Sequence, residues 1–427
     1  MEVYKFGGAS VKDAQNIRQL AEIVKQAPRP LVIVVSAMGK TTNGLEKIID
    51  AYFFHNKDFS QQLQKIKNYH LEITQELFPA SHPVFNYLER LFLTLENELS
   101  RPPSMNYDFD YDRIIVFGEL ISTTIISQYL NLQGQNNLWI DAREIIKTDN
   151  NHREGNVDWQ LTETLIRKQL DFSNTDLYVT QGFIASDRNN QSISLGREGS
   201  DFSAAIIASA LSADKLTVWK DVDGIYSADP KRFSQAQKIN NLSYRETIEL
   251  AFYGAKVIHP KTLKPLKDKN IPLYVKSFVN PQQPGTVIHS FAEDLSPKVP
   301  VIIVKDSQIL ISLAMRDASF ITEKEIEKIF AIINRHKSKN NVMQRSALSF
   351  SFCTDYDHAH TPAMIEELKN HFTVKYNTDL TLYTIRHYTR EVIEKITAGK
   401  EILLHQQSRH NVYFVVKETT EVPQTSL

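Results

Sequence analysis

Residues 3–35, VYKFGGASVKDAQNIRQLAEIVKQAPRPLVIVV, decide the fold class of this chain. An apolar strand at 3–6 is followed by two glycines, by a helical segment at about 11–25 and by an all-apolar strand at 31–35. Continuous apolar strands that are joined by helical crossovers indicate a parallel sheet with helices on both faces. The chain is therefore predicted to be an α/β protein.

The alternation of strand and helix continues to about residue 290. Further strands are expected at 114–117, 138–141, 177–182, 216–219 and 272–277. Residues 61–77 and 83–99 have the pattern of two amphipathic helices, which we interpret as an insertion covering about 50–105. Residues 1–292 are accordingly predicted to form one domain, a mostly parallel sheet that is sandwiched by helices.

A second, α+β region is expected at 299–427, after a proline-rich and then a polar stretch. Strands are predicted at 302–314, 347–353, 380–386, 401–406 and 411–416, and helices at 322–336, 362–372 and 391–397. These elements repeat a strand–helix–strand–strand order, and the second repeat stops near Val416. We therefore expect the second unit of this region to be incomplete.

Composition excludes several classes of protein. Of 427 residues, 42% are apolar and 23% charged, as in soluble globular proteins, and the net charge of −1 suggests neither nucleic acid nor an anionic membrane as partner. No apolar run reaches the ~20 residues of a membrane span, and the N-terminus does not resemble a signal peptide. Cys353 is the single cysteine, so one chain can form neither a disulfide framework nor a cysteine-based metal site. We expect a cytoplasmic protein.

Several common nucleotide motifs can be tested and rejected. A Walker P-loop that ended in Gly39-Lys40-Thr41 would need a glycine where Val34 stands. The dinucleotide fingerprint, the protein-kinase signature and the HExxH zinc motif are also absent. Any phosphate chemistry must therefore use another loop.

Two loops near the N-terminus are candidates for that chemistry. Gly7 and Gly8 follow the first strand and can direct backbone N–H groups at an anion, while Lys5 adds a full charge. The loop that starts at Ser36 brings hydroxyl groups, including Thr42, to the start of the next helix. A structural turn and a simple helix cap remain open as alternatives.

Later loops bring charged groups to the same edge of the sheet. Glu119 follows the expected strand 114–117, where a carboxylate suits a substrate ammonium. Ser200 is expected to cap a helix, with Asp201 in its first turn, and both could serve only that purpose. Arg197 lies between glycines, where a guanidinium can hold a carboxylate in a bidentate fork.

The loop 219–231 is rich in turn-forming residues and follows another strand. In it, Tyr226 could stack on an adenine, and Lys220 and Lys231 could face phosphates. Lys256 lies near a further loop–helix junction. Each of these signals is weak when it is taken alone.

Taken together and in this order, the motifs resemble those of aspartokinases, members of the amino-acid kinase superfamily. KFGGAS at 5–10 resembles the family's KFGGTS, SLGREGSD at 194–201 resembles TLGRGGSD, KDVDGIYSADPK at 220–231 resembles TDVPGIYTTDPR, and GAKVIHP at 254–260 resembles GAKVLHP. The tail resembles the paired ACT domains of this family, which would make it a regulatory and dimerising region.

The resemblance implies roles for named residues. Lys5 and Asp201 would be catalytic. Aspartate would be held by Thr42, Glu119, Arg197, Glu198, Gly199 and Ser200. The ATP site would be lined by Lys5, Phe6, Gly7, Gly8, Ser36, Lys220, Asp221, Tyr226, Lys231, Lys256 and Val257. No protein side chain is expected to form a dedicated metal site.

The implied reaction is transfer of the γ-phosphoryl group of ATP, with Mg²⁺, to the side-chain carboxylate of L-aspartate, the first step of lysine, threonine and methionine biosynthesis. The acceptor has a pKa of about 3.9 and is already ionised at pH 7, so no general base is needed. The implied assembly is a homodimer through the ACT-like region.

Two departures from the family pattern leave questions open. Glu198 stands where the family has glycine, and Gln344-Arg345-Ser346-Ala347 stands where the family has a TTSE-like inhibitor loop, so lysine or threonine inhibition is not determined. The alternatives are another kinase of the superfamily, acting on glutamate, acetylglutamate or UMP, and an amino-acid-binding regulatory protein with a catalytically weak kinase domain.

Overall fold

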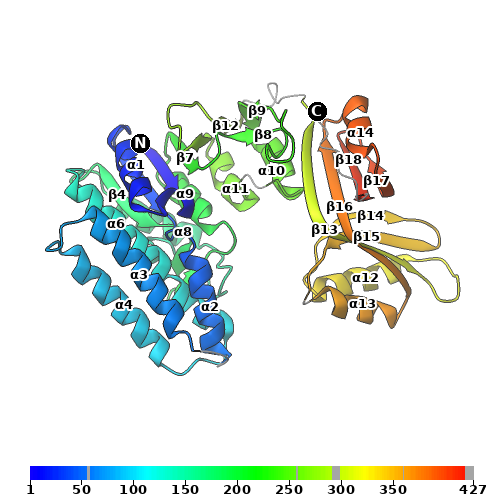
Figure 1. Cartoon of the computed structure of the whole chain (residues 1–427), viewed down its shortest axis with the longest axis horizontal. Helices are drawn as coiled ribbons and strands as arrows, with labels where there is room; N and C mark the ends of the chain where they lie inside the picture. The colour runs from blue at the N-terminus through cyan, green and yellow to red at the C-terminus, as the bar shows by residue number, and fades with distance from the viewer. Residues whose placement is uncertain (55–57, 256–257, 291–298, 359, 419–427) are drawn as a thin grey trace. The chain divides into compact units, whose positions relative to one another are not determined.

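The computed structural model of the chain describes residues 1–54, 58–255, 258–290, 299–358 and 360–418 (Figure 1). It divides into two compact units, and each is described by itself. The first consists of Met1–Ile225, Ile239–Ile248 and Val257–Ser296, and the second of Tyr226–Lys238, Glu249–Lys256 and Pro297–Leu427.

An eight-stranded sheet organises the first unit. The strand order is β10-β12-β11-β7-β1-β2-β4-β3, and every pairing from β11 to β3 is parallel. The strands are β1 (Glu2–Phe6), β2 (Leu31–Val35), β3 (Leu138–Ile140), β4 (Leu177–Gln181), β7 (Lys215–Lys220), β10 (Asn241–Ser243), β11 (Leu273–Ser277) and β12 (Thr286–His289). The predicted mostly parallel α/β sheet is confirmed.

Helices cover both faces of this sheet, and the central strands β1, β2 and β4 are buried along their whole length. The helices of this unit are α1 (Ala14–Lys25), α2 (Thr41–Phe53), α3 (Ser60–Leu77), α4 (Val84–Ser100), α5 (Tyr107–Ile115), α6 (Phe117–Leu132), α7 (Ala142–Ile145), α8 (Trp159–Gln169), α9 (Gly199–Ala210) and α11 (Pro260–Asp268), and α10 (Tyr244–Phe252) begins in this unit and ends in the second. Tyr4 and Phe6 of β1 point into the core that α1 and α6 share, whereas Lys5 points to the opposite face, toward α9. The two predicted helices of the insertion are α3 and α4, which lie side by side (Figure 1).

The prediction of a strand at 114–117 is wrong, because these residues are helical. Asn106 caps α5, since its Oδ1 accepts hydrogen bonds from the backbone N–H groups of Asp108 and Phe109. α5 and α6 meet at Val116 inside the core, and a helix that is buried on all sides has the same continuous apolar pattern as a buried strand.

The stretch Tyr107–Leu132, which comprises α5 and α6, is long and apolar enough to cross a membrane by composition alone. Of its apolar 18-residue window, 83% is buried within the protein, and core helices share such a composition.

The second unit is built on a six-stranded antiparallel sheet in the order β14-β15-β13-β16-β18-β17. The strands are β13 (Val301–Ala314), β14 (Asn340–Arg345), β15 (Ser349–Asp355), β16 (Thr373–Arg386), β17 (Glu401–Gln407) and β18 (Asn411–Lys417), and the helices are α12 (Glu323–Arg335), α13 (Thr361–Lys369) and α14 (Arg390–Thr397). β14 was not expected, because it is a polar edge strand in which Val342 alone is buried.

β13 and β16 extend over 14 residues each and pair along their length. Val301–Lys305, the first part of β13, lies beside the second part of β16, and β16 continues to β18 and β17. In the sequence, the second repeat consists of three strands and a helix, which are the second part of β16, α14, β17 and β18. In the structure, its sheet has a fourth strand, the first part of β13, which comes from earlier in the chain.

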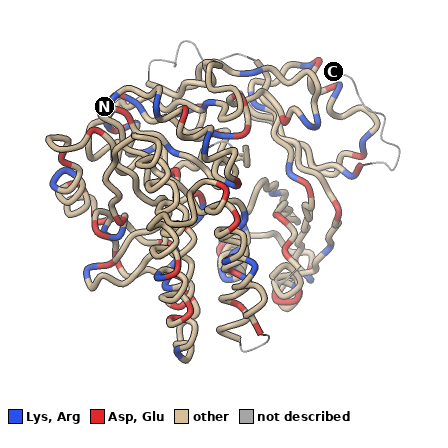
Figure 2. Tube along the Cα trace, turned by 60° about the vertical axis from the view of Figure 1, so that its left-hand side comes forward, with Lys and Arg blue, Asp and Glu red and all other residues tan. Residues whose placement is uncertain are grey.

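Basic and acidic residues are intermixed along the described part of the chain (Figure 2). This distribution agrees with the net charge of −1.

Candidate active site

Three charged side chains meet on the α9 face of the first unit's sheet. Lys5 Nζ lies 2.7 Å from Oδ1 of Asp201, in the first turn of α9, and Lys220 Nζ at the end of β7 lies 3.7 Å from Oδ2. Because β1 and β7 are parallel neighbours, their ends bring the two lysines to the same carboxylate. Lys5, Asp201 and Lys220 are called the charge trio below.

The charge trio keeps Asp201 ionised although its carboxylate is buried. Burial by itself would raise the pKa of Asp201, but the two ammonium groups outweigh it, Lys5 first and then Lys220, and the pKa lies below its usual value. The trio carries one net positive charge at the end of the central strands.

The Gly-Gly loop packs closely on the loop after β2. A Cβ on Gly8 would lie 2.7 Å from the carbonyl oxygen of Ala37, so the position excludes every larger residue. Gly39 N–H donates to the Gly8 carbonyl at 3.0 Å, and Lys5 Nζ lies 3.5 Å from the point where a Cβ of Gly7 would be. The predicted grouping of Lys5, Gly7 and Gly8 is therefore present.

Glu119 reaches the same loop from the first turn of α6. Its Oε1 accepts a hydrogen bond from the Ala37 N–H at 3.3 Å, and its Oε2 has no hydrogen-bond partner among the described residues. Burial raises the pKa of Glu119 to about 8, with the Ala37 hydrogen bond and the charge of Lys5 acting in the opposite direction. An unsatisfied buried carboxyl oxygen of this kind suits a cationic group of a ligand.

The start of α9 rests on the end of β4. A Cβ on Gly182 would lie 2.5 Å from Cβ of Ser200, so the glycine lets the helix approach the strand. The expectation that Ser200 caps α9 is wrong: the helix begins at Gly199, and Glu198 occupies the cap position without a side-chain hydrogen bond. Glu198 is left-handed, with φ of 56°, a conformation that glycine adopts more readily than other residues.

Arg197 and Glu198 are exposed at the rim of this region. The Arg197 guanidinium makes no hydrogen bond or ion pair with any residue that the structure describes. Both side chains lie within electrostatic range of His259, which precedes α11. Burial lowers the pKa of His259, Glu198 opposes that shift, and Lys261 and Arg197 reinforce it. The sequence analysis did not single out His259, although a histidine before a proline is a recognisable helix start.

Several predicted residues have a local structural role. The side chain of Phe6 is fully buried and stacked on Trp219. Only its backbone reaches the mouth, by which we mean the region where the charge trio, the Gly7-Gly8 loop and Glu119 meet. There the Phe6 carbonyl accepts a hydrogen bond from the Ser36 N–H. Thr42 lies half-buried in the first turn of α2. Asp221 is exposed just after β7.

The predicted ATP-site residues are divided between the units. Lys220 and Asp221 belong to the first unit, and Tyr226 and Lys231 belong to the second. Lys256 and Val257 lie outside the described residues.

Asp112 is a residue that sequence reasoning missed. Its buried carboxylate accepts hydrogen bonds from Ser194 Oγ at 2.6 Å and from the Arg153 N–H at 2.9 Å, and His152 Nδ1 lies at 2.9 Å. Burial raises the pKa of Asp112, and these contacts oppose the shift. Asp112 thus anchors the strand that leads into the loop of Arg197. In the sequence it is one of three aspartates that alternate with aromatic residues at 107–112, and nothing there sets it apart from the other two.

The chain matches the model of the amino acid kinase family over residues 1–277. It is 32% identical to an aspartokinase of Chlamydia pneumoniae, over 78% of this chain and 73% of that protein. It is 28% identical to lysine-sensitive aspartokinase 3 of Escherichia coli, over 97% and 95% of the two chains.

Similarity extends to a solved structure, that of E. coli aspartokinase III in complex with aspartate and ADP, with a TM-score of 0.80, 26% identity and coverage of 97% of this chain and 96% of that one. The family match and the curated relative over most of both chains agree with the geometry of the site. The chain belongs to the amino acid kinase family and, within it, to the aspartokinases.

Proposed function

We propose that this chain is an ATP-dependent aspartate kinase that converts L-aspartate to 4-phospho-L-aspartate and ADP. The proposal rests on two groups of side chains that lie at one mouth. One is the cationic charge trio at the ends of β1 and β7, and the other is the acidic Glu119 at the start of α6, whose buried Oε2 has no hydrogen-bond partner among the described residues. The first suits a transferring phosphoryl group, and the second suits the ammonium of an amino acid.

The difficulty of the reaction is electrostatic, because an anion must approach a polyanion. Lys5 lies over the Gly7 backbone, where its charge can neutralise the transferring group, and Asp201 holds that ammonium in place. The acceptor carboxylate is ionised at neutral pH, so orientation and charge stabilisation account for the catalysis.

On the acceptor side, Glu119 binds the ammonium of aspartate and Arg197 binds one of its carboxylates. Glu198, Gly199, Ser200 and Thr42 complete this side. On the nucleotide side, Gly7, Gly8, Ser36, Lys220 and Asp221 of the first unit are proposed to contribute.

Mg²⁺ is proposed to enter with the nucleotide. Magnesium in such sites is bound mainly by phosphate oxygens and water, with one or two carboxylates. Asp201 is buried and has a lowered pKa, so it offers a carboxylate that would reach a metal through water while it holds the lysines. The ion would supply further positive charge to the transferring group.

The test is release of ADP that depends on aspartate, combined with trapping of the product as a hydroxamate by hydroxylamine, which reacts with acyl phosphates. Glutamate, N-acetylglutamate and UMP replace aspartate in parallel reactions. We expect release and hydroxamate with aspartate alone. ADP release with another acceptor would identify a different kinase, and binding of aspartate without turnover would identify a regulatory protein; the comparisons favour neither alternative.

We further propose that residues 299–427 form an ACT-like dimerising region that responds weakly to lysine. Ala347 stands where the family's inhibitor loop has an acidic residue, which removes a partner for the ammonium of an effector. Sedimentation at micromolar protein should give a dimer, and millimolar lysine should inhibit by less than half. A monomer, or inhibition below 1 mM lysine, would contradict this proposal.

A further inference from the structure

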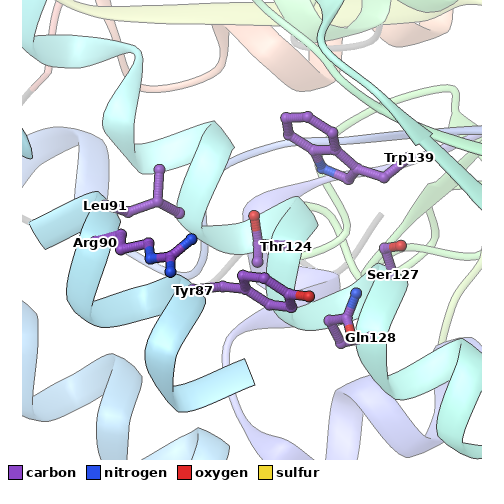
Figure 3. A pocket seen from close by; sticks show the side chains of 7 residues that line it. All are labelled: Tyr87, Arg90, Leu91, Thr124, Ser127, Gln128 and Trp139. Atoms are coloured by element: carbon purple, nitrogen blue, oxygen red, sulfur yellow. The ribbon is translucent and has the colours of Figure 1, made fainter. Parts of the chain in front are cut away.

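A pocket of about 320 Å³ lies on the first unit between α4, α6 and β3, apart from the residues of the proposed active site. Its walls are Tyr87, Arg90 and Leu91 from α4, Thr124, Ser127 and Gln128 from α6, and Trp139 from β3 (Figure 3). The volume is at the lower end of the range of small-molecule sites. Nothing in the proposed reaction uses this pocket.

The apolar part of the pocket is held in a fixed orientation. The indole Nε1 of Trp139 donates to Thr123 Oγ1 at 2.9 Å, and that hydroxyl donates in turn to the Glu119 carbonyl. The residues Trp139 and Tyr87 are 37% and 43% exposed, which is high for aromatic residues in a folded protein. Two aromatic walls and Leu91 therefore present a surface on which a planar ring can stack.

The polar part of the pocket contains a cation without a counter-ion. The Arg90 guanidinium points into the space between the helices (Figure 3), and it makes no ion pair or hydrogen bond with any residue that the structure describes. No acidic side chain lines the pocket, and the positions one helical turn from Arg90 are Asn86, Tyr87, Leu93 and Thr94. Charge complementarity thus favours an anion.

The other polar groups agree with a planar anion. Ser127 and Thr124 are already satisfied, because their hydroxyls bond Asn137 Oδ1 at 2.7 Å and the Leu120 carbonyl at 2.8 Å. The side chains of Tyr87 and Gln128 make no hydrogen bond within the described part of the chain, and the amide of Gln128 faces the pocket (Figure 3). A guanidinium and an amide beside aromatic walls are suited to a carboxylate attached to a ring.

We propose that this pocket is a binding site for a small aromatic carboxylate that lacks an ammonium group. The contrast with the proposed active site supports the last condition. There, buried Glu119 can meet an ammonium, whereas in the pocket a zwitterionic amino acid would desolvate its ammonium without a partner.

The experiment is calorimetric titration of the full-length chain with 3-phenylpropanoate, and with L-phenylalanine, which carries the same ring and carboxylate plus an ammonium. The active site is kept filled with aspartate and ADP, and the Arg197→Ala variant is titrated to exclude binding there. We expect saturable binding of phenylpropanoate with a Kd of about 0.1–1 mM, and binding of phenylalanine at least about tenfold weaker.

Arg90→Gln should weaken phenylpropanoate binding by about 10- to 100-fold, because it removes a charge-assisted bond, and Trp139→Ala should weaken it by a similar factor. Arg245→Gln, at another exposed arginine that does not line the pocket, should leave the Kd unchanged. Equal Kd values for the Arg90→Gln variant and the unchanged chain, equal binding of phenylalanine, or no binding at 10 mM would each overturn the proposal. A Trp139→Ala chain with an altered sedimentation coefficient would identify the face as an interface between copies, and would also overturn it.

Discussion

Two buried carboxyl groups at the same mouth have pKa values that are shifted in opposite directions. At the ends of β1 and β7, the carboxylate of Asp201 is buried with two ammonium groups beside it, and its pKa falls. At the start of α6, the carboxyl of Glu119 is equally buried but accepts hydrogen bonding from backbone N–H in place of two ammonium groups, and burial raises its pKa to about 8.

The difference separates a site that is already assembled from one that a ligand completes. A buried charge without a partner costs stability, so an unpaired carboxyl in a mouth indicates where a cation is to bind. The charge trio is complete before any substrate arrives, whereas Glu119 is satisfied only once the proposed ammonium is present. Substitutions at the two places should therefore have different signatures.

The largest expected effect is on turnover. Lys5→Ala should lower kcat by at least about 10³-fold, because a preorganised charge beside the transferring phosphoryl group contributes a few kcal/mol. Removing Lys5 also leaves Asp201 with Lys220 as its only partner in the trio, which should destabilise the fold.

The double variant Lys5→Ala/Asp201→Asn separates these two effects. We expect it to recover thermal stability without recovering kcat. A soluble Lys5→Ala chain that retains more than about a tenth of kcat would contradict the role given to the trio.

The second prediction concerns Glu119→Gln. It should raise KM for aspartate by about 10- to 100-fold with little change in KM for ATP, because a charge-assisted contact is lost. A fall in ATP affinity instead would place Glu119 on the nucleotide side.

The same substitution should change stability with pH. Since the folded-state pKa of Glu119 is raised, unfolded chains lose this proton at lower pH than folded ones, and the carboxyl lowers stability progressively between about pH 4.5 and 8. The unliganded Glu119→Gln chain should therefore gain thermal stability relative to the unchanged chain at pH 8 and not at pH 4.5, as differential scanning calorimetry can show.

A third prediction tests the role of Arg197, which is exposed at the edge of the proposed acceptor site. Arg197→Ala should raise KM for aspartate by about 10- to 100-fold without affecting the unfolding temperature, because this exposed guanidinium has no partner among the described residues. Arg188→Ala is the matched control, since Arg188 is exposed and pairs with Asp158. Equal KM values for the two variants would remove Arg197 from the acceptor site.

The smallest effect is expected at Glu198. Glycine at this left-handed position should relieve about 1 kcal/mol of backbone strain, partly offset by its greater freedom in the unfolded chain, so Glu198→Gly should raise the unfolding temperature slightly. Glu198→Ala removes the same carboxylate but keeps the strain, and should give no gain. A gain with alanine would show that the carboxylate, and not the backbone, destabilises the loop.

The parallel sheet and the grouping of its loops were predictable, because the apolar strands and the glycines report local geometry directly. The helices α5 and α6 were not, since an apolar segment that is buried on all sides has no period by which helix and strand differ. Contacts between distant segments could not be predicted from the sequence either. The hydrogen bond from Ser194 to Asp112, for example, joins residues that are 82 positions apart. The left-handed conformation of Glu198 has no sequence signal either, so the cap was assigned to Ser200 although α9 begins one residue earlier.

The raised pKa of Glu119 implies that substrate binding is coupled to proton release. At pH 7 the empty site carries this carboxyl mostly in its neutral form, because its pKa is about 8. An ammonium group at Oε2 would favour the carboxylate, so each aspartate that binds should send close to one proton into solution. The heat of aspartate binding should then vary with the ionisation enthalpy of the buffer, and aspartate affinity should increase as the pH rises toward 8.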